Sequence, residues 1–378
     1  MPDRTNVAES GAWAGARVVI VHDWLTGMRG GEKVLESICR LFPSADLLTL
    51  VHVPGAVSPT IERRRIRTSF VQRLPRAGRW YRQYLPVFPV AIEAFDLDDV
   101  DLVISTSHCA AKAVVPTGRA HHVCYCHSPM RYGWDQFNAY FGRDRLGPIG
   151  HAMARHTLAW LARWDRRTAG RVDRFLANSQ YVAGRIARYY NRQATVLYPP
   201  VDTEFFSPAA QEPTPSFLVV SALVPYKRID LAIVAANRAA VPLRVVGTGP
   251  DLARLRALAG PTVEFVGGVD DEALRGEYRR ARAVLLPGEE DFGIVPVEAM
   301  ACGRPVIALA RGGALETVLD GVTGRLLPDD GIATWTAALA TFDPAEYEAS
   351  RIRAHAEQFS TARFEAGFAA FLSAEAAC

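Results

Sequence analysis

The chain has 378 residues, a length that suits two globular domains rather than one. Hydrophobic residues make up 49% of it and charged residues 22%, values that exclude a wholly disordered or fibrous protein. The net charge is only +3, but residues 1–198 hold 27 basic and 16 acidic side chains, whereas residues 199–378 hold 16 and 24. The two halves therefore differ in sign, and each is expected to face a different kind of partner.

Short apolar runs alternate with helix-length segments along the whole chain. Uninterrupted apolar strands of this kind are typical of parallel sheets that helices cover on both faces. The sequence therefore predicts an α/β fold, repeated in the two halves. The predicted strands are residues 17–22, 101–105 and 122–126 in the first half, and 217–221, 243–246, 263–266, 283–286 and 305–309 in the second.

The boundary between the halves is a change in composition. Residues 198–216 are rich in proline and have no helical period, which predicts an extended connector. Residues 362–372 space phenylalanines at helical intervals, which predicts an amphipathic helix at the end of the chain.

The expected compartment is the cytoplasm. The first fifteen residues carry charges and lack the apolar core of a signal peptide. No apolar run approaches the ~18 residues that span a bilayer. Six cysteines scattered over so long a chain do not form a disulfide framework, so reduced thiols are expected.

Paired glycines follow the first predicted strand. Gly30 and Gly31 open the helical segment GGEKVLESICRLF, where they let the backbone approach a ligand closely and expose N–H groups to it. The segment lacks the GxxxxGK[ST] spacing of a P-loop. It is therefore a candidate ligand-binding loop of another type.

Arginines crowd residues 63–84, where they are mixed with aromatic residues. This composition fits an anionic membrane surface or a lipid phosphate. Nucleic acid fits it too, but nothing else in the chain resembles a nucleic-acid-binding module. The open alternative is a solvated surface with arginines stacked on aromatic rings. The residues are Arg63, Arg64, Arg65, Arg67, Arg73, Arg76, Arg79 and Arg82, with Phe70, Trp80, Tyr81 and Tyr84.

Histidines and cysteines crowd residues 121–127. On a strand, His122, Cys124 and Cys126 share one face, and no second ligand cluster lies at a usual spacing, so no metal site is predicted. His127 ends the run at the start of a proline-containing loop. It is the histidine that we expect to line a cleft.

Two adjacent cations, Lys227 and Arg228, follow the predicted strand 217–221. Ligands of open α/β sheets bind at the carboxyl ends of strands, where two cations suit a diphosphate. Lys227 is one of only three lysines beside 40 arginines, which favours a need for a compact ammonium group. A solvated helix start is the alternative. The turn VGTGPD, residues 246–251, has only part of a dinucleotide-binding fingerprint, so NAD is not expected.

Residues 287–303, PGEEDFGIVPVEAMACG, join an acidic turn to a helix. Glu290 precedes the helix and Glu298 lies inside it, roughly 10 Å away, too far for the paired carboxylates of a retaining glycosidase. The spacing suits an extended ligand, whose hydroxyls the carboxylates bind while backbone N–H groups face an anionic group. Acids that only complement the helix dipole are the alternative, which leaves Glu298 unexplained. The N–H groups are those of Gly293, Ile294 and Val295.

The chain resembles the family 4 retaining glycosyltransferases of the GT-B fold across nearly its whole length. The most specific signature is the E-x7-E window from Glu290 to Glu298, followed by AMACGRPVIA. The segments RGGALE, GTGPD and LVPYKRID agree in order and spacing. GGEKVLE and CYCHSPMRYGWD are similar to bacterial O-antigen and exopolysaccharide mannosyltransferases.

The resemblance implies two Rossmann-like, doubly wound parallel-sheet domains that face a cleft. Residues 16–200 would form the acceptor-side domain, with a helix at 360–378 packing back on it. Residues 214–358 would form the nucleotide-sugar-binding domain. Metal ions and cofactors are not needed in such enzymes.

The resemblance also implies a role for each candidate residue. Glu298 would bind the ribose hydroxyls and Glu290 the donor sugar, beside which His127 would lie. Lys227 would neutralise the diphosphate, helped by Arg228 and by the N–H groups of residues 293–295 and of Gly30 and Gly31. Where the family commonly has Gly-Arg or Ser-Arg, this chain has Ser221 and Ala222. Either Arg228 would supply the missing charge, or diphosphate binding and activity would be weaker.

The expected reaction transfers a hexose, mannose from GDP-mannose, to a lipid-linked saccharide with retention of configuration, in the synthesis of a cell-surface polysaccharide such as lipopolysaccharide. The basic first half would bind the anionic inner face of the cell membrane peripherally. Three alternatives stay open. They are a UDP-sugar-dependent transferase of the same fold, a non-catalytic nucleotide-sugar-binding protein, and an enzyme of this fold that isomerises or phosphorolyses sugars.

Overall fold

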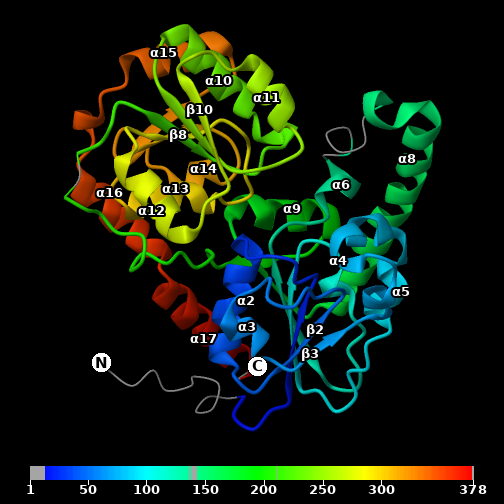
Figure 1. Ribbon diagram of the computed structural model, residues 1–378. Coiled ribbons are helices and arrows are strands. Elements are labelled where there is room, and N and C mark those ends of the chain that lie inside the picture. The colour runs from blue at the N-terminus through cyan, green and yellow to red at the C-terminus, as the bar shows by residue number, and fades with distance from the viewer. Residues whose placement is uncertain (1–12, 136, 138–142, 211, 377–378) are drawn as a thin grey trace. The chain divides into compact units, whose positions relative to one another are not determined.

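The computed structural model describes residues 13–135, 137, 143–210 and 212–376. The chain divides into two compact units, one built from Met1–Pro200 with Ala362–Cys378 and the other from Val201–Thr361. Each unit has one parallel sheet with helices packed around it (Figure 1). The predicted α/β fold with two doubly wound sheets is therefore confirmed.

The first unit contains a seven-stranded parallel sheet in the order β3-β2-β1-β4-β5-β6-β7. Strands are added on one side of β1 and then, from β4 on, on the other side. The carboxyl ends of β1 and β4 therefore lie side by side where the direction reverses, the usual ligand site of an open α/β sheet. The strands are β1 Val18–His22, β2 Asp46–Thr49, β3 Ile66–Thr68, β4 Leu102–Ser107, β5 His121–Cys126, β6 Arg174–Ala177 and β7 Ala194–Val196.

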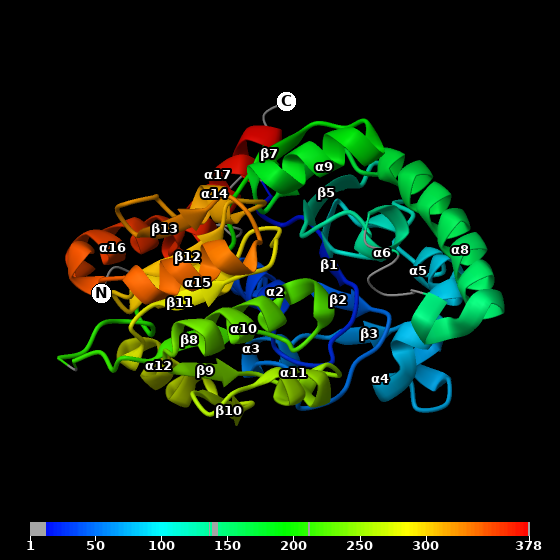
Figure 2. The same cartoon turned by 90° about the horizontal axis from the view of Figure 1, so that it is seen from above.

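Helices cover both faces of this sheet, and α8 lies at the edge of the unit in both views (Figures 1 and 2). The α-helices of the unit are α2 Gly30–Leu41, α3 Pro59–Glu62, α4 Ala77–Trp80, α5 Phe88–Glu93, α6 Arg131–Trp134, α8 Arg143–Thr168, α9 Gln180–Tyr190 and α17 Thr361–Ala376. The short 3₁₀ helices are η1 Phe70–Arg73, η2 Tyr81–Val87, η3 Ala111–Ala113 and η4 Ala169–Arg171.

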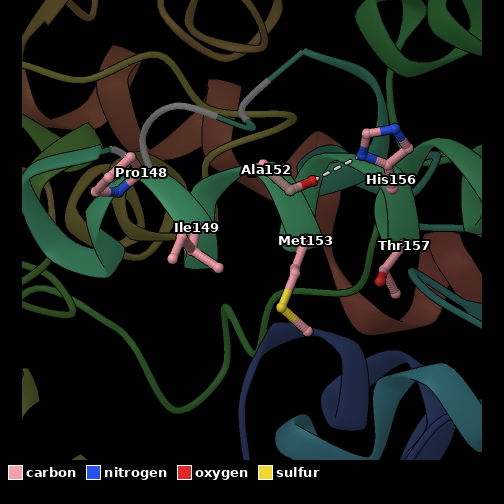
Figure 3. A pocket seen from close by; sticks show the side chains of 6 residues that line it. All are labelled: Pro148, Ile149, Ala152, Met153, His156 and Thr157. Carbon is pink, nitrogen blue, oxygen red and sulfur yellow. Dashed lines mark hydrogen bonds between the residues drawn. The ribbon is translucent and has the colours of Figure 1, made fainter.

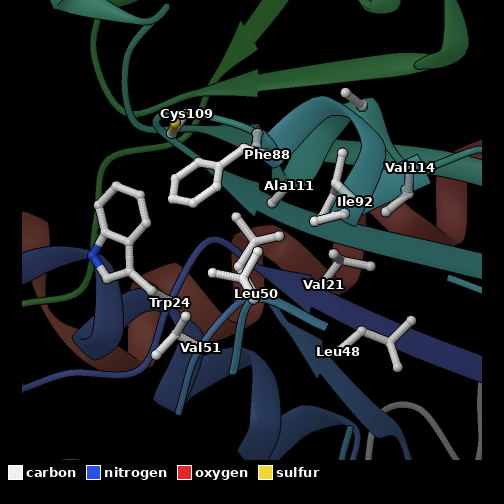
Figure 4. Packing of buried hydrophobic residues seen from close by; sticks show 14 of the residues in the cluster. Val21, Trp24, Leu48, Leu50, Val51, Phe88, Ile92, Cys109, Ala111 and Val114 are labelled. Atoms are coloured by element: carbon white, nitrogen blue, oxygen red, sulfur yellow. The ribbon is translucent and has the colours of Figure 1, made fainter. Parts of the chain in front are cut away.

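Alternate residues of the central strands supply two apolar layers, because successive side chains of a strand point to opposite faces. Val21 packs in one layer with Leu48 and Phe88 (Figure 4). Ile20 packs in the other layer with Phe364 of the C-terminal helix α17. The last helix of the chain thus completes the core of the first unit.

The second unit contains a six-stranded parallel sheet in the order β10-β9-β8-β11-β12-β13. The direction reverses between β8 and β11, so the carboxyl ends of these two strands form the expected ligand site. The strands are β8 Phe217–Val220, β9 Leu243–Val246, β10 Val263–Gly267, β11 Val284–Leu286, β12 Val306–Leu309 and β13 Gly324–Leu327. The helices are η5 Pro225–Lys227, α10 Ile229–Ala239, α11 Leu252–Leu258, α12 Asp271–Arg280, α13 Ile294–Ala301, α14 Ala314–Thr317, α15 Ile332–Thr341, η6 Pro344–Glu346, α16 Ala349–Ala356 and η7 Glu357–Phe359.

Within the described part of the chain, none of the helices combines the length and the apolar character that crossing a bilayer requires.

Candidate functional site

The switch point of the second sheet brings Lys227 and Glu290 together. Lys227 ends η5, directly after β8, and Glu290 lies in the loop after β11. The Lys227 ammonium group donates to a carboxylate oxygen of Glu290, and the two side chains are 16% and 15% exposed. Two residues that the sequence analysis selected separately thus form one ion pair at the place where the topology predicts a ligand.

The loop after β12 fixes the backbone of the Glu290 loop. The N–H group of Gly313 donates to the carbonyl oxygen of Glu290 at 2.8 Å. A Cβ on Gly312 would lie 2.3 Å from that same oxygen, and one on Gly313 would lie 2.4 Å from Phe292 Cα. The two glycines of the RGGALE segment are therefore required for this close approach.

The glycines of the VGTGPD turn have a similar packing role. A Cβ on Gly247 would lie 1.9 Å from the carbonyl oxygen of Ser221, and one on Gly249 would lie 2.3 Å from that of Leu223. The turn after β9 thus packs against the loop that leads to Lys227. This contact explains the glycines without a dinucleotide.

Arg228 is held by carboxylates on both sides. Its backbone adopts the left-handed conformation, with φ 53°, and its guanidinium donates to Asp330 Oδ2 at 2.5 Å and lies 3.6 Å from Asp230 Oδ1. The hydrogen bond from Arg228 holds the pKa of Asp330 below its usual value. Arg228 is thus ion-paired, as Lys227 is, and its substitution for the arginine missing at Ala222 stays a prediction.

The helix α13 begins at a glycine cap. Its N-cap is Gly293, with φ 93° and ψ 79°, and this residue has no side chain that could accept from the first turn. The first N–H groups of an α-helix have no partner within the helix. Ile294 and Val295 are partly exposed, so this end of the helix is one that can face an anion.

Glu298 lies on the inner side of α13 and is only 5% exposed. Its Oε2 accepts a hydrogen bond of 2.8 Å from the hydroxyl group of Tyr278, which is fully buried on α12. Burial, reinforced by the charge of Glu298, raises the pKa of Tyr278 well above its usual value, so the hydroxyl remains a donor. Sequence reasoning missed Tyr278, because a tyrosine in an amphipathic helix looks like an ordinary core residue.

In the first unit, the equivalent switch point contains a buried carboxylate. Asp23 follows β1 and accepts four backbone N–H groups that follow β4, at 2.6–3.0 Å. It also pairs with His108, whose Nδ1 lies 3.0 Å from Asp23 Oδ2. Burial alone would raise the pKa of Asp23, but the charge and hydrogen bonds of His108 outweigh it and hold the pKa well below its usual value. The four N–H groups belong to His108, Cys109, Ala110 and Ala111.

His127 ends β5 beside this pair. Its ring centroid lies 6.3 Å from that of His108, and a Cβ on Gly31 would lie 3.5 Å from its Nε2. That nitrogen is buried and has no hydrogen-bond partner among the described residues. Burial, with the nearby charges of His108 and His22, lowers the pKa of His127 to about 3, so its ring is neutral at physiological pH.

His22 and Glu32 complete this set of polar groups. His22 Nδ1 lies 2.5 Å from Thr106 Oγ1 and its Nε2 lies 3.8 Å from a carboxylate oxygen of Glu32. Glu32 also accepts from the N–H group of Arg29 at 3.1 Å, at the start of α2, where the candidate residues Gly30 and Gly31 lie. The signals that could have located these residues are His22-Asp23 directly after the first strand and the histidine after the strand at 101–105.

The histidine and cysteines of β5 have structural roles. His122 is fully buried, and its two ring nitrogens lie 2.8 Å from Ser105 Oγ and 2.9 Å from the carbonyl oxygen of Arg171. Cys124 and Cys126 are buried in the core. The described residues contain no group of three or more His, Cys, Asp or Glu side chains suited to holding a metal ion.

The arginine-rich segment at 63–84 is largely exposed, but its aromatic residues are not all at the surface. Tyr81 is only 2% exposed and belongs to the core. Arg82 lies over its ring at 4.6 Å, and Arg76 lies over Trp80 at 4.8 Å. The alternative of arginines stacked on aromatic rings is therefore found at these two positions.

Comparison with known proteins gives the family. Residues 28–205 match the family described as Glycosyltransferase Family 4, and residues 200–358 match the family described as Glycosyl transferases group 1. A D-inositol 3-phosphate glycosyltransferase from Mycolicibacterium smegmatis is 31% identical over 225 residues, which are 52% of this chain and 52% of that protein. Its counterpart from Geodermatophilus obscurus is 30% identical over 312 residues, 68% of each protein.

A third relative is the GDP-mannose-dependent alpha-(1-6)-phosphatidylinositol monomannoside mannosyltransferase from M. smegmatis. It is 33% identical over 205 residues, which are 46% of this chain and 54% of that protein. The chain thus spans from about half to about two thirds of the length of these curated relatives.

Solved structures share the fold over nearly the whole chain. Anabaena Alr3699/HepE in complex with UDP has a TM-score of 0.67 and 17% identity, covering 95% of this chain and 100% of that one. Sucrose-phosphate synthase from Thermosynechococcus elongatus has a TM-score of 0.70 and 18% identity, covering 94% and 98%. The chain belongs to the family 4 glycosyltransferases and has their GT-B fold.

Proposed function

We propose that this glycosyltransferase transfers a hexose from a nucleoside diphosphate sugar to a hydroxyl group of a lipid-linked saccharide, with retention at the anomeric carbon. The observation that carries the proposal is the ion pair of Lys227 and Glu290 at the switch point of the second sheet, next to the start of α13. A cation, a carboxylate and the first N–H groups of a helix at one place suit a ligand that carries both phosphates and hydroxyls.

Donor binding would divide this ion pair between two parts of the ligand. The diphosphate would draw the Lys227 ammonium group away from Glu290, assisted by the N–H groups of residues 293–295. Glu290 would then accept hydrogen bonds from hydroxyls of the donor sugar. Glu298, fixed by Tyr278, would accept from the ribose hydroxyls.

The chemical step would need positioning and charge stabilisation rather than a protein nucleophile. The bond between the anomeric carbon and the phosphate oxygen breaks, and its electron pair leaves with the diphosphate. The acceptor oxygen bonds to the anomeric carbon on the same face, and its proton passes to an oxygen of the departing diphosphate. Lys227 would stabilise the negative charge that develops, and the neutral ring of His127 in the first unit would contact the donor sugar.

GDP-mannose is the proposed donor. One relative, 33% identical over 205 residues, is a GDP-mannose-dependent mannosyltransferase that acts on a phosphatidylinositol mannoside, a lipid-linked saccharide. The second candidate is a UDP-sugar, because the structural neighbour HepE was solved with UDP. The product would enter a cell-surface polysaccharide such as lipopolysaccharide.

The proposed location is the cytoplasm, with peripheral binding to the inner face of the cell membrane. The basic first half supports it, since residues 1–198 hold 27 basic and 16 acidic side chains. Seven of the eight arginines at 63–82 are exposed, which suits an anionic lipid surface.

A thermal-shift panel of GDP-, UDP- and ADP-sugars tests the donor, because a ligand stabilises the folded state in proportion to its occupancy. We expect GDP-mannose to raise the melting temperature most, and Glu298→Gln to remove most of that shift. A larger shift with a UDP-sugar would identify that UDP-sugar, and not GDP-mannose, as the donor. Donor binding without any release of nucleotide, with or without a lipid-linked acceptor, would identify a non-catalytic binding protein. Release of nucleotide that increases when a lipid-linked acceptor is added would exclude isomerisation or phosphorolysis.

A further inference from the structure

The helix α8 has an outward face that is apolar at its start and basic at its end. The element covers Arg143–Thr168, but Gly147 has a non-helical backbone, with φ 67° and ψ 174°. Regular helix therefore starts at Pro148, a residue well suited to the first helical position because its φ is already fixed.

The inner face of α8 is fixed to the first unit. Leu161 and Trp164 are buried in the core, and Trp164 Nε1 donates to Glu93 of α5 at 2.9 Å. Asp165 is fully buried and pairs with Lys112 at 2.9 Å. These contacts set the orientation of the helix about its axis, and a neighbouring face of the helix is left outward.

Three large apolar side chains lie on that outward face. Ile149 is 77% exposed, Met153 67% and Trp160 43%, and the first two are the most exposed large hydrophobic residues in the described part of the chain. At 100° per residue the three positions fall within about 40° of one another around the helix axis. Figure 3 shows the side chains of Ile149 and Met153 extending from the same side of α8. They line a shallow depression of about 570 Å³ with Pro148, Ala152, His156 and Thr157.

From Pro148 onward, the exposed charged side chains of α8 all carry one sign. From Pro148 to the end of the helix there are four arginines and one acidic residue, Asp165. Asp165 is buried and paired with Lys112, so it does not offset the exposed cations. Arg163 and Arg167 lie beyond Trp160 on the same side of the helix as the apolar residues. The four exposed arginines are Arg155, Arg163, Arg166 and Arg167.

We propose that the outward face of α8 docks the first unit onto an anionic phospholipid surface. Ile149 and Met153 would enter the boundary between headgroups and acyl chains, and Trp160 would lie at that boundary, which indole rings favour. The arginines would contact lipid phosphates. A second copy of the chain is a poor occupant, because two such faces would bring like charges together. The inference rests on the proposed lipid-linked acceptor, and α8 would bring the enzyme to the membrane that holds this acceptor.

Vesicle sedimentation with the full chain tests this inference. We expect binding to vesicles of phosphatidylcholine with about 30% phosphatidylglycerol, little binding to pure phosphatidylcholine, and release by high salt. Ile149→Ser with Met153→Ser should weaken binding to the anionic vesicles about tenfold or more. Arg163→Gln with Arg167→Gln should weaken it by about thirtyfold, since each arginine near the surface contributes about fivefold.

The controls are exposed residues of the same unit that are not part of α8. Val90→Ser removes a side chain that is 64% exposed, and Arg119→Gln removes an exposed cation. Both should bind vesicles as the unaltered chain does, and all variants should keep its melting temperature and its thermal shift with GDP-mannose. That donor shift separates a failure of the docking face from a failure of the proposed function.

Equal vesicle binding by the α8 variants and the unaltered chain would overturn the inference, and so would equal binding to neutral and anionic vesicles. Analytical ultracentrifugation tests whether the same face instead joins two copies of the chain. A dimer that Ile149→Ser with Met153→Ser abolishes, with vesicle binding intact, would assign the face to self-association and refute docking to lipid.

Discussion

Lys227 and Glu290 are 63 residues apart in the chain, and their side chains form an ion pair at the point where the strand order of the second sheet reverses. Each residue therefore neutralises the other before any ligand arrives. A donor must bring a negative group for the lysine and hydroxyl donors for the glutamate to replace that pair. This requirement selects a sugar linked to a phosphate over a sugar or a phosphate alone.

Replacing Lys227 should impair the chemical step more than donor binding. In Lys227→Ala we expect kcat to fall by about 10²–10³-fold, because the negative charge on the leaving diphosphate loses its nearest cation. The donor KM should change less than tenfold. Steady-state kinetics with saturating acceptor measure both constants. Arg238→Ala, which removes an exposed cation of α10 in the same unit, should change neither, and an unchanged kcat in Lys227→Ala would exclude the lysine from catalysis.

Replacing Glu298 should instead weaken donor binding. Glu298→Gln keeps the size of the side chain but removes the charge that strengthens its hydrogen bonds, so donor affinity should fall about tenfold or more. Tyr278→Phe should give a smaller loss, because the carboxylate stays but loses one of its fixed donors. Isothermal titration calorimetry with the donor measures both effects. The exposed Glu272→Gln is the matched control, and donor affinity unaltered in Glu298→Gln would refute the ribose contact.

Asp23 is predicted to stabilise the first unit. Asp23→Ala should lower the free energy of unfolding by roughly 3 kcal/mol or more, because it leaves four buried N–H groups and His108 without their acceptor. The folded-state pKa of Asp23 is lowered, so its contribution is complete above the ordinary value of 3.8 and is lost as the pH falls below that value. Urea unfolding at pH 7 and at pH 3 measures the change. A difference between variant and unaltered chain that is larger at pH 3 would contradict this sign.

The lowered pKa of His127 should make the fold sensitive to mild acid. Its pKa is lowered to about 3 in the folded chain, whereas an unfolded histidine titrates near 6.5. Between these two values the unfolded chain binds a proton that the folded chain does not, so folding stability falls by up to about 1.4 kcal/mol per pH unit below 6.5. In His127→Gln this slope between pH 7 and 5 should be smaller. The exposed His156→Gln should retain the full slope, and an imidazole signal of His127 that titrates near pH 6.5 by NMR would disprove the account.

Local patterns predicted β1, β4, β5 and β8 to β12, but not β2, β3, β6, β7 and β13. β1 and β8 are uninterrupted apolar runs and were predicted nearly to the residue. β3 and β7 have three residues each, lie at the two edges of the first sheet, and are partly exposed, so they carry no apolar run. Their sequences, IRT and ATV, cannot be told from a loop without the neighbouring strand that pairs with them.

The contacts within the candidate site also could not be predicted from sequence, because they join residues that are far apart in the chain. Lys227, Glu290 and Glu298 were selected from their places at strand ends and in a helix, but that Lys227 and Glu290 touch depends on β8 and β11 being neighbours. The pair of Asp23 and His108 spans 85 residues and relies on backbone N–H groups, which have no sequence signature. Sequence alone therefore predicts which residues are candidates for a ligand site, and the order of strands in the sheet decides which of these residues touch.

The most direct test of the central claim needs no acceptor. GDP-α-mannose incubated with the full chain should be hydrolysed slowly, since water can replace the acceptor hydroxyl, and proton NMR during the first minutes identifies the anomer released. We expect α-mannose to appear first, because transfer retains configuration, and Lys227→Ala to abolish the release while Arg238→Ala does not. Initial release of β-mannose, or hydrolysis that persists in Lys227→Ala, would contradict a retaining transferase that depends on the lysine at the switch point.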